Sequence, residues 1–357
     1  IREHFAPQPD VHLAVDQFFG SYGERARYGL LQKVALNGWG RSRLAVELMP
    51  SEFKRAFGLV RDDDVDVLLD ASGFAFGDQH PPERTMRFAD RVEAAKRAGN
   101  TVILLPQALG PFEQPAIRDA FGRVVGAADL VCARDDGSMH YAQEAVGAPN
   151  HLIQAPDFTN LVTPNLSVQS DESDRVSIVP NQRMVDKAET QEVADAYVPF
   201  MANCVKGVWD AGLRPVLLLH GADDVELAHA IQERVGRPLS IHQDDDPVEL
   251  KRFLGGSHLV IGSRFHALVG ALSQGVPSIG TSWSHKYEML FNEYNCPDML
   301  LPVSTDEEEV QACIEAASGT QRAALVGRIR PAADALKEET RSMWSQVDDV
   351  LSVCAER

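Results

Sequence analysis

Apolar residues in the first half of the chain follow two alternating patterns. Short aliphatic runs at 65–69, 101–105 and 130–133 have the length expected of buried strands. Between them, apolar residues recur every three to four positions, as they do on one face of a helix. The helical stripes are Leu30, Leu31 and Val34, then Phe88, Val92 and Ala95, then Ile117, Phe121 and Val124. Strands that alternate with helices in this way predict a parallel sheet.

The same alternation restarts in the second half, after a polar stretch without periodicity around 163–175. The strands predicted there are 176–179, 215–219, a short one near Ser240, 259–262 and 278–280, with a helix over 247–254. The polar stretch has the composition of a linker. We therefore predict an α/β fold with two Rossmann-like domains, residues 1–165 and 166–331, whose parallel sheets are flanked by helices and face a central cleft. In the C-terminal segment 332–357, a helix over about 332–353 is expected to pack back on the first domain.

Composition and charge exclude several classes of function. The 357 residues, which suit two domains, include 34 Lys and Arg against 52 Asp and Glu, for a formal net charge of −18. Nucleic-acid binding is not expected, because phosphate backbones are bound by dense basic surfaces. No apolar run approaches the length of a membrane span and no signal segment stands at the start, so a cytoplasmic protein is expected. The five cysteines lack the spacing of a zinc site, and neither a metal nor a cofactor is predicted.

The segment 262–277 carries the strongest candidate for chemistry. It has the pattern of a strand end, an N-cap at Ser263, one helix and a stop at Gly275. Arg264 and His266 then fall in the first helical turn, where free N–H groups and the helix dipole favour an anion. A guanidinium and an imidazole there predict a phosphate or carboxylate site. The alternative is that Arg264 pairs with an acidic neighbour while His266 is a satisfied polar residue of the core.

Further candidates for substrate binding lie where predicted strands end, apart from Gly23. They are Ser263, Asn181, Arg183, His220, Ser284, Lys286, Gln107, Arg134 and Gly23. A lysine can hold an anion as a point charge, although a surface lysine would fit position 286 equally well. Gln107 is expected to be free to bond a sugar hydroxyl, whereas Arg134 has an internal ion pair with Asp135 as its alternative. Gly23 belongs to a predicted loop, 20–24, whose backbone could approach a ligand.

An ordered set of motifs resembles the polysaccharide pyruvyl transferase family and covers most of the chain. The set is PQALGPF at 106–112, ARDDGS at 133–138, APDF at 155–158, VPN at 179–181 and SRFHALVGALSQGVPSIGTSWSHK at 263–286. The last block is the most specific, since the Arg-x-His, the later Gly-x-Pro and the distal Lys recur in that family in this order. Two loops depart from the family pattern, with Ser21-Tyr22-Gly23-Glu24 in place of Asn-x-Gly-Asp and Ala71-Ser72-Gly73 in place of Gly-Gly-Gly.

The resemblance implies transfer of a pyruvyl group from phosphoenolpyruvate to two hydroxyls of a sugar or glycan, with no cofactor besides this donor. The second domain would bind the donor and the first the acceptor. Arg264, Arg183 and Lys286 would be anion clamps and His266 the general acid or base, while the partner for the second proton is unidentified. Two rivals remain, a glycosyltransferase that uses a nucleotide sugar on the same fold and a non-catalytic relative that binds glycans or anions. The acceptor and the oligomeric state are not indicated.

Overall fold

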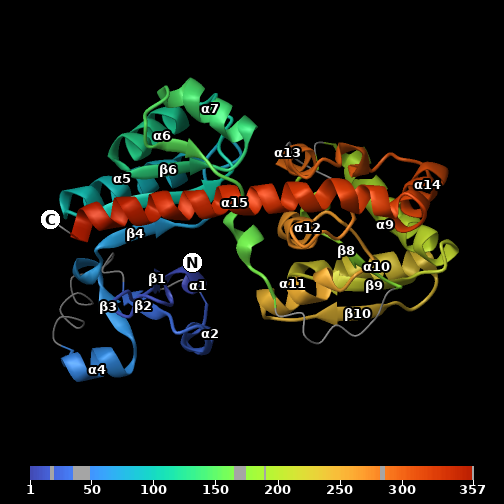
Figure 1. Cartoon of the computed structure of the whole chain (residues 1–357), viewed down its shortest axis with the longest axis horizontal. Helices are drawn as coiled ribbons and strands as arrows, with labels where there is room; N and C mark the ends of the chain where they lie inside the picture. Colours follow the sequence, from blue (N-terminus) through green and yellow to red (C-terminus); the bar gives the residue numbers. More distant parts are fainter. Residues whose placement is uncertain (17–19, 35–48, 165–173, 189, 282–285, 356–357) are drawn as a thin grey trace.

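Two lobes joined by one long helix make up the protein, whose computed structural model describes residues 1–16, 20–34, 49–164, 174–188, 190–281 and 286–355. The long helix is α15 (Arg322–Ala355), and Figure 1 shows it running across both lobes. Within these described ranges all strands pair in parallel, in three sheets flanked by helices, which confirms the predicted α/β class. The predicted domain boundary at 165/166 falls outside the described residues.

The first lobe is built around a four-stranded sheet in the order β4-β5-β6-β7. Its strands are Val67–Asp70, Thr101–Gln107, Leu130–Ala133 and Leu152–Gln154. The helices between them are α5 (Pro82–Arg97), α6 (Pro115–Ala127) and α7 (Asp136–Val146), and the short helix η2 (Phe158–Leu161) follows β7. One face of the sheet packs on α5 and α6 through Val92, Leu104 and Phe121, because alternate residues of a strand point to opposite faces.

A smaller sheet in the order β1-β2-β3 precedes it and corrects two predictions. Its elements are α1 (Arg2–Phe5), β1 (Ala14–Asp16), α2 (Tyr22–Arg27), β2 (Leu31–Val34), α4 (Ser51–Ala56), β3 (Leu59–Arg61) and η1 (Asp62–Asp64). The helix predicted from Leu30, Leu31 and Val34 is wrong, because this segment is a strand paired on both sides. The loop predicted at 20–24 is also wrong, since a capping box between Ser21 and Glu24 starts α2 there.

The second lobe holds a five-stranded sheet in the order β10-β9-β8-β11-β12. The strands are β8 (Arg175–Val179), β9 (Arg214–Leu219), β10 (Ser240–Gln243), β11 (Leu259–Gly262) and β12 (Ser278–Gly280). The helices are α8 (Arg183–Asp186), α9 (Gln191–Asp210), η3 (Ala222–Asp224), α10 (Val225–Val235), α11 (Pro247–Gly255), α12 (Phe265–Leu272), α13 (Lys286–Glu293), η4 (Pro297–Met299) and α14 (Glu307–Ser318). Leu218 and Val260 pack on α11 and α12, and their neighbours Leu217 and Ile261 pack on α9 and α10.

Helix α15 shares the cores of both lobes. It begins at Arg322 rather than near Ala332, with Pro331 inside it. Its first turns place Leu325 and Ile329 in the core of the second lobe. Its last turns place Trp344 and its neighbours against the face of the first sheet that α5 and α6 leave open. Among the described residues, no helix combines the length and apolarity that crossing a membrane requires.

A polar contact fastens α15 to the segment after β7. The buried Asn160 amide donates to Thr340 Oγ1 at 2.9 Å and to the Leu336 carbonyl oxygen at 3.3 Å. We expect Thr340→Val to lower the free energy of unfolding by about 1–3 kcal/mol, because it removes one acceptor from a buried amide. Urea denaturation of this variant beside the exposed Glu339→Ala on the same helix checks the value. A Thr340→Val protein as stable as Glu339→Ala would show that the contact contributes nothing.

Candidate functional site

The carboxyl ends of the two larger sheets face each other across a cleft. Arg134 follows β6 and Asp157 follows β7, while Phe265 and His266 follow β11. The guanidinium carbon of Arg134 lies 4.2 Å from the centre of the Phe265 ring, and His266 Nε2 lies 3.6 Å from Asp157 Oδ2. Ligands of open α/β folds bind at such carboxyl ends, so this is the candidate active site.

The Asp157 carboxylate lies at the centre of the cleft, where hydrogen bonds fix its orientation. This residue was not singled out from the sequence. Its Oδ1 accepts from the backbone N–H of Thr159 at 3.0 Å and from Thr159 Oγ1 at 2.6 Å. Its Oδ2 is left for His266 and for Arg134 Nη1, which is 3.7 Å away. Burial acts to raise the pKa of Asp157, but the charges of His266 and Arg134 and the Thr159 hydrogen bonds hold it below its usual value. The only signal in the sequence was the APDF block at 155–158.

His266 lies at the cleft beside Asp157. The side chain keeps 63% of its surface exposed, so a ligand can reach it. Enclosure by the cleft walls lowers the pKa of His266, the Asp157 carboxylate opposes this, and the positive charges of Arg134 and Lys286 reinforce it. Because the pKa of His266 lies below its usual value, the imidazole is suited to accept a proton at neutral pH. Asp157 orients it from across the cleft.

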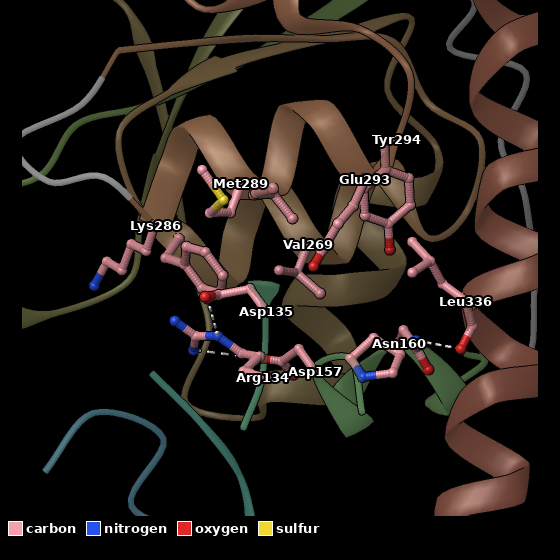
Figure 2. Close-up of a pocket in the computed structure, with 13 residues that line it drawn as sticks. Arg134, Asp135, Asp157, Asn160, Val269, Lys286, Met289, Glu293, Tyr294 and Leu336 are labelled. Carbon is pink, nitrogen blue, oxygen red and sulfur yellow. Dashed lines mark hydrogen bonds and ion pairs between the residues drawn. The ribbon is translucent and has the colours of Figure 1, made fainter. Parts of the chain in front are cut away.

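Two buried cations lie beside this pair. Arg134 is 4% exposed and Lys286 9%, and the Lys286 Nζ lies 4.7 Å from the centre of the Phe74 ring and 5.4 Å from that of Phe265. The buried Nη2 of Arg134 has no hydrogen-bond partner among the described residues. Burial, and then the charge of Arg134, lower the pKa of Lys286 to about 8. Two cations held together away from water favour an anion between them, and Figure 2 shows both pointing to the same side of the pocket.

Arg264 is tied to acidic neighbours, as the alternative in the sequence allowed. Its Nη2 donates to Asp224 Oδ1 at 2.6 Å and to Asp223 Oδ1 at 3.1 Å, and its Nε donates to Asp224 Oδ2 at 3.1 Å. It occupies the N-cap position of α12, so the N-cap predicted at Ser263 is wrong. The reason is that Ser263 is wholly buried and its hydroxyl bonds to the Tyr197 hydroxyl instead.

Ser263 and Asn181 support the turn that carries Arg264 and His266 and do not face the cleft. The carbonyl oxygen of Ser263 accepts from Asn181 Nδ2 at 2.7 Å and from the Tyr287 hydroxyl at 2.6 Å. Asn181 is 3% exposed. Both residues therefore position the turn, and substrate binding by their side chains stays a prediction.

The remaining predicted residues lie in different environments. His220 carries a buried Nε2 without a partner among the described residues, and burial, with the charges of Arg264 and His266, lowers its pKa to about 4. Gln107 is not free, because it is fully buried and its Nε2 donates to Asp70 Oδ2 at 2.8 Å.

The Arg183 side chain is 50% exposed, and its Nη1 lies 3.5 Å from Asp186 Oδ2. Gly23 is exposed in the first turn of α2. Ser284 lies outside the described residues.

Known structures resemble this chain in architecture, and a family model matches its sequence. The crystal structure of HepE from Anabaena in complex with UDP and glucose superimposes with a TM-score of 0.61 at 14% identity, covering 99% of this chain and 94% of that one. MnaA from S. aureus, solved with UDP, gives a TM-score of 0.58 at 13% identity, covering 93% and 87%. These likenesses show a GT-B-like fold. The model of the polysaccharide pyruvyl transferase family matches residues 12–285. The chain therefore belongs to the polysaccharide pyruvyl transferase family, a family of enzymes that act on glycans.

Proposed function

We propose that this protein transfers a pyruvyl group from phosphoenolpyruvate to two hydroxyls of a sugar or glycan. The observation that carries the proposal is the unsatisfied Nη2 of Arg134 beside Lys286, next to a neutral imidazole. Phosphoenolpyruvate carries a carboxylate and a phosphate, and charge-assisted hydrogen bonds from Arg and Lys bind both groups strongly. The sugar hydroxyl that must lose a proton finds a base in His266.

Different residues of the cleft bind the donor and transfer the proton. Arg134 and Lys286 hold the anionic donor and offset the charge that moves onto phosphate as it leaves. His266, oriented by Asp157, takes the proton of the first attacking hydroxyl. Addition of that hydroxyl to the donor double bond, departure of phosphate and closure by the second hydroxyl give a cyclic ketal. Arg264 supports the start of α12 through Asp224.

A nucleotide-sugar donor is the second candidate. It is favoured by the likeness to HepE and MnaA, whose structures hold UDP, and in it the cations of the cleft would hold a diphosphate. The two donors differ in what they release, inorganic phosphate in one case and a nucleotide in the other, so one experiment separates them.

We expect phosphate release from phosphoenolpyruvate that depends on an acceptor, measured over a panel of galactose-, mannose- and glucosamine-containing glycans. Lys286→Met should raise the KM for phosphoenolpyruvate by roughly 10- to 100-fold, because a charge-assisted hydrogen bond contributes about 1.5–3 kcal/mol. Lys206→Met is the matched control, since this lysine is half-exposed on α9 and lies 3.9 Å from Glu307, outside the cleft. No release with any acceptor, together with calorimetric binding of a nucleotide sugar, would replace this proposal by the second candidate.

A further inference from the structure

Glu293, at the end of α13, is an acidic residue that the site described so far does not use. Its carboxyl group makes no hydrogen bond or ion pair among the described residues, although the residue is only partly exposed. It lines a small cavity together with Arg134, Asp157 and Lys286, and Figure 2 shows its side chain extending from α13 toward the middle of that cavity. The cavity has room for about one water molecule. Enclosing a carboxyl group without a partner costs free energy, so a functional role for Glu293 is expected.

The charges around Glu293 are mostly negative. The negative charges of Asp135 and Asp136 act on it from the start of α7, and that of Asp157 acts from the segment after β7. The positive charge of Arg134 opposes them, and Lys286 lines the same cavity. Burial first, and then these carboxylates, raise the pKa of Glu293 to about 8. The group therefore carries a proton at neutral pH, whereas His266 does not. Pairs of groups whose environments move their pKa values apart in this way are the usual acid and base of an active site.

We propose that Glu293 is the second proton-transfer residue, which supplies the proton for the donor through a water molecule in the cavity. This inference rests on the proposed pyruvyl transfer. Glu293 gives its proton to the methylene carbon of phosphoenolpyruvate, while the first hydroxyl bonds to the neighbouring carbon and gives its own proton to His266. The bond from that carbon to the phosphate oxygen then breaks, and phosphate leaves with the proton from His266. The second hydroxyl closes the ketal ring and its proton returns to Glu293, so both groups are restored.

The test is Glu293→Gln, which keeps the shape of the protonated side chain. We expect kcat to fall by about 10²-fold or more with KM for phosphoenolpyruvate nearly unchanged, because an acid contributes to the transition state and not to donor binding. At saturating phosphoenolpyruvate, where loss of the Lys286 charge no longer limits donor binding, the wild-type kcat should decline as the pH rises through about 8, where Glu293 loses its proton. This decline in kcat should be absent from the residual activity of the variant. Glu288→Gln, an exposed residue of the same helix, is the matched control.

The outcomes are distinct. A Glu293→Gln enzyme with wild-type kcat and an unchanged alkaline decline would overturn the inference and leave Lys286, whose pKa is also about 8, as the group that titrates. Infrared difference spectra of wild type against Glu293→Gln should show a protonated carboxyl band at pH 7, and its absence would also overturn the inference. If the wild type releases no phosphate with any acceptor, the proposed function itself fails, and the assignment of Glu293 fails with it.

Discussion

Replacing Arg264 by alanine is expected to lower the free energy of unfolding by about 3–5 kcal/mol, apart from any effect on turnover. Asp224 is completely buried, and two of its interactions are with the Arg264 guanidinium. The third, from the backbone N–H of Gln182 at 3.1 Å, is too weak to replace a cation. Removing Arg264 therefore leaves the buried Asp224 carboxylate without a positive partner. Guanidinium chloride denaturation of the variant measures the loss.

Two further variants test whether the loss of stability comes from the unpaired Asp224 carboxylate, or whether any substitution near the cleft lowers the free energy of unfolding. Arg183→Ala should change stability by no more than about 1 kcal/mol, because Arg183 and Asp186 are both well exposed. Asp224→Asn combined with Arg264→Met should recover much of the loss, since no buried charge then remains unpaired. An Arg264→Ala protein as stable as Arg183→Ala would show that Asp224 does not depend on this ion pair. Kinetic data on Arg264→Ala alone would therefore confuse unfolding with lost catalysis.

His266→Ala is expected to lower kcat by about 10²- to 10⁴-fold while donor binding is retained, because a general base acts on the acceptor hydroxyl in the transition state. His140→Ala is a suitable control, since that side chain is 68% exposed on α7. Steady-state phosphate release and calorimetry with phosphoenolpyruvate measure the two quantities. Near-normal turnover in His266→Ala, with donor binding intact, would show that the base lies elsewhere.

The pH dependence gives a second measurement on the same pair. A base works only when unprotonated, so activity should be lost as the pH falls through the pKa of His266, which lies below 6.5. The Asp157 carboxylate raises that pKa, and Asp157→Asn should therefore move the acid limb to lower pH. A limb that stays in place in Asp157→Asn would show that this carboxylate does not act on the titrating group.

Much of the second lobe could be predicted from the sequence because its signals are local. The strand 259–262 and the helix after it follow from an aliphatic run, a polar turn and a glycine stop, and the observed elements are β11 and α12. The segment 30–34 shows where such signals fail. Its apolar spacing fits one turn of helix and a short strand equally well, and pairing with β1 and β3 decides between them.

The site was predictable only in part, since its decisive contacts join distant parts of the chain. That Arg264 is neutralised depends on β9 and β11 lying on either side of β8, which brings Asp224 to it across 40 positions. Asp157 meets His266 because two sheets face each other, and no local pattern marks that meeting. Glu293 is likewise enclosed by residues of both lobes, which no local sequence pattern predicts.

The shared helix α15 also bears on how the chain can be made. Ile103, Leu105 and Cys132 line the face of the first sheet that Met343, Trp344 and Val347 cover. A ribosome synthesises those covering residues about two hundred positions after the last strand of that sheet. Until they emerge, the lobe that carries Arg134 and Asp157 exposes an apolar surface to the cell. The lobe that carries this half of the site is therefore completed only after α15 has been synthesised.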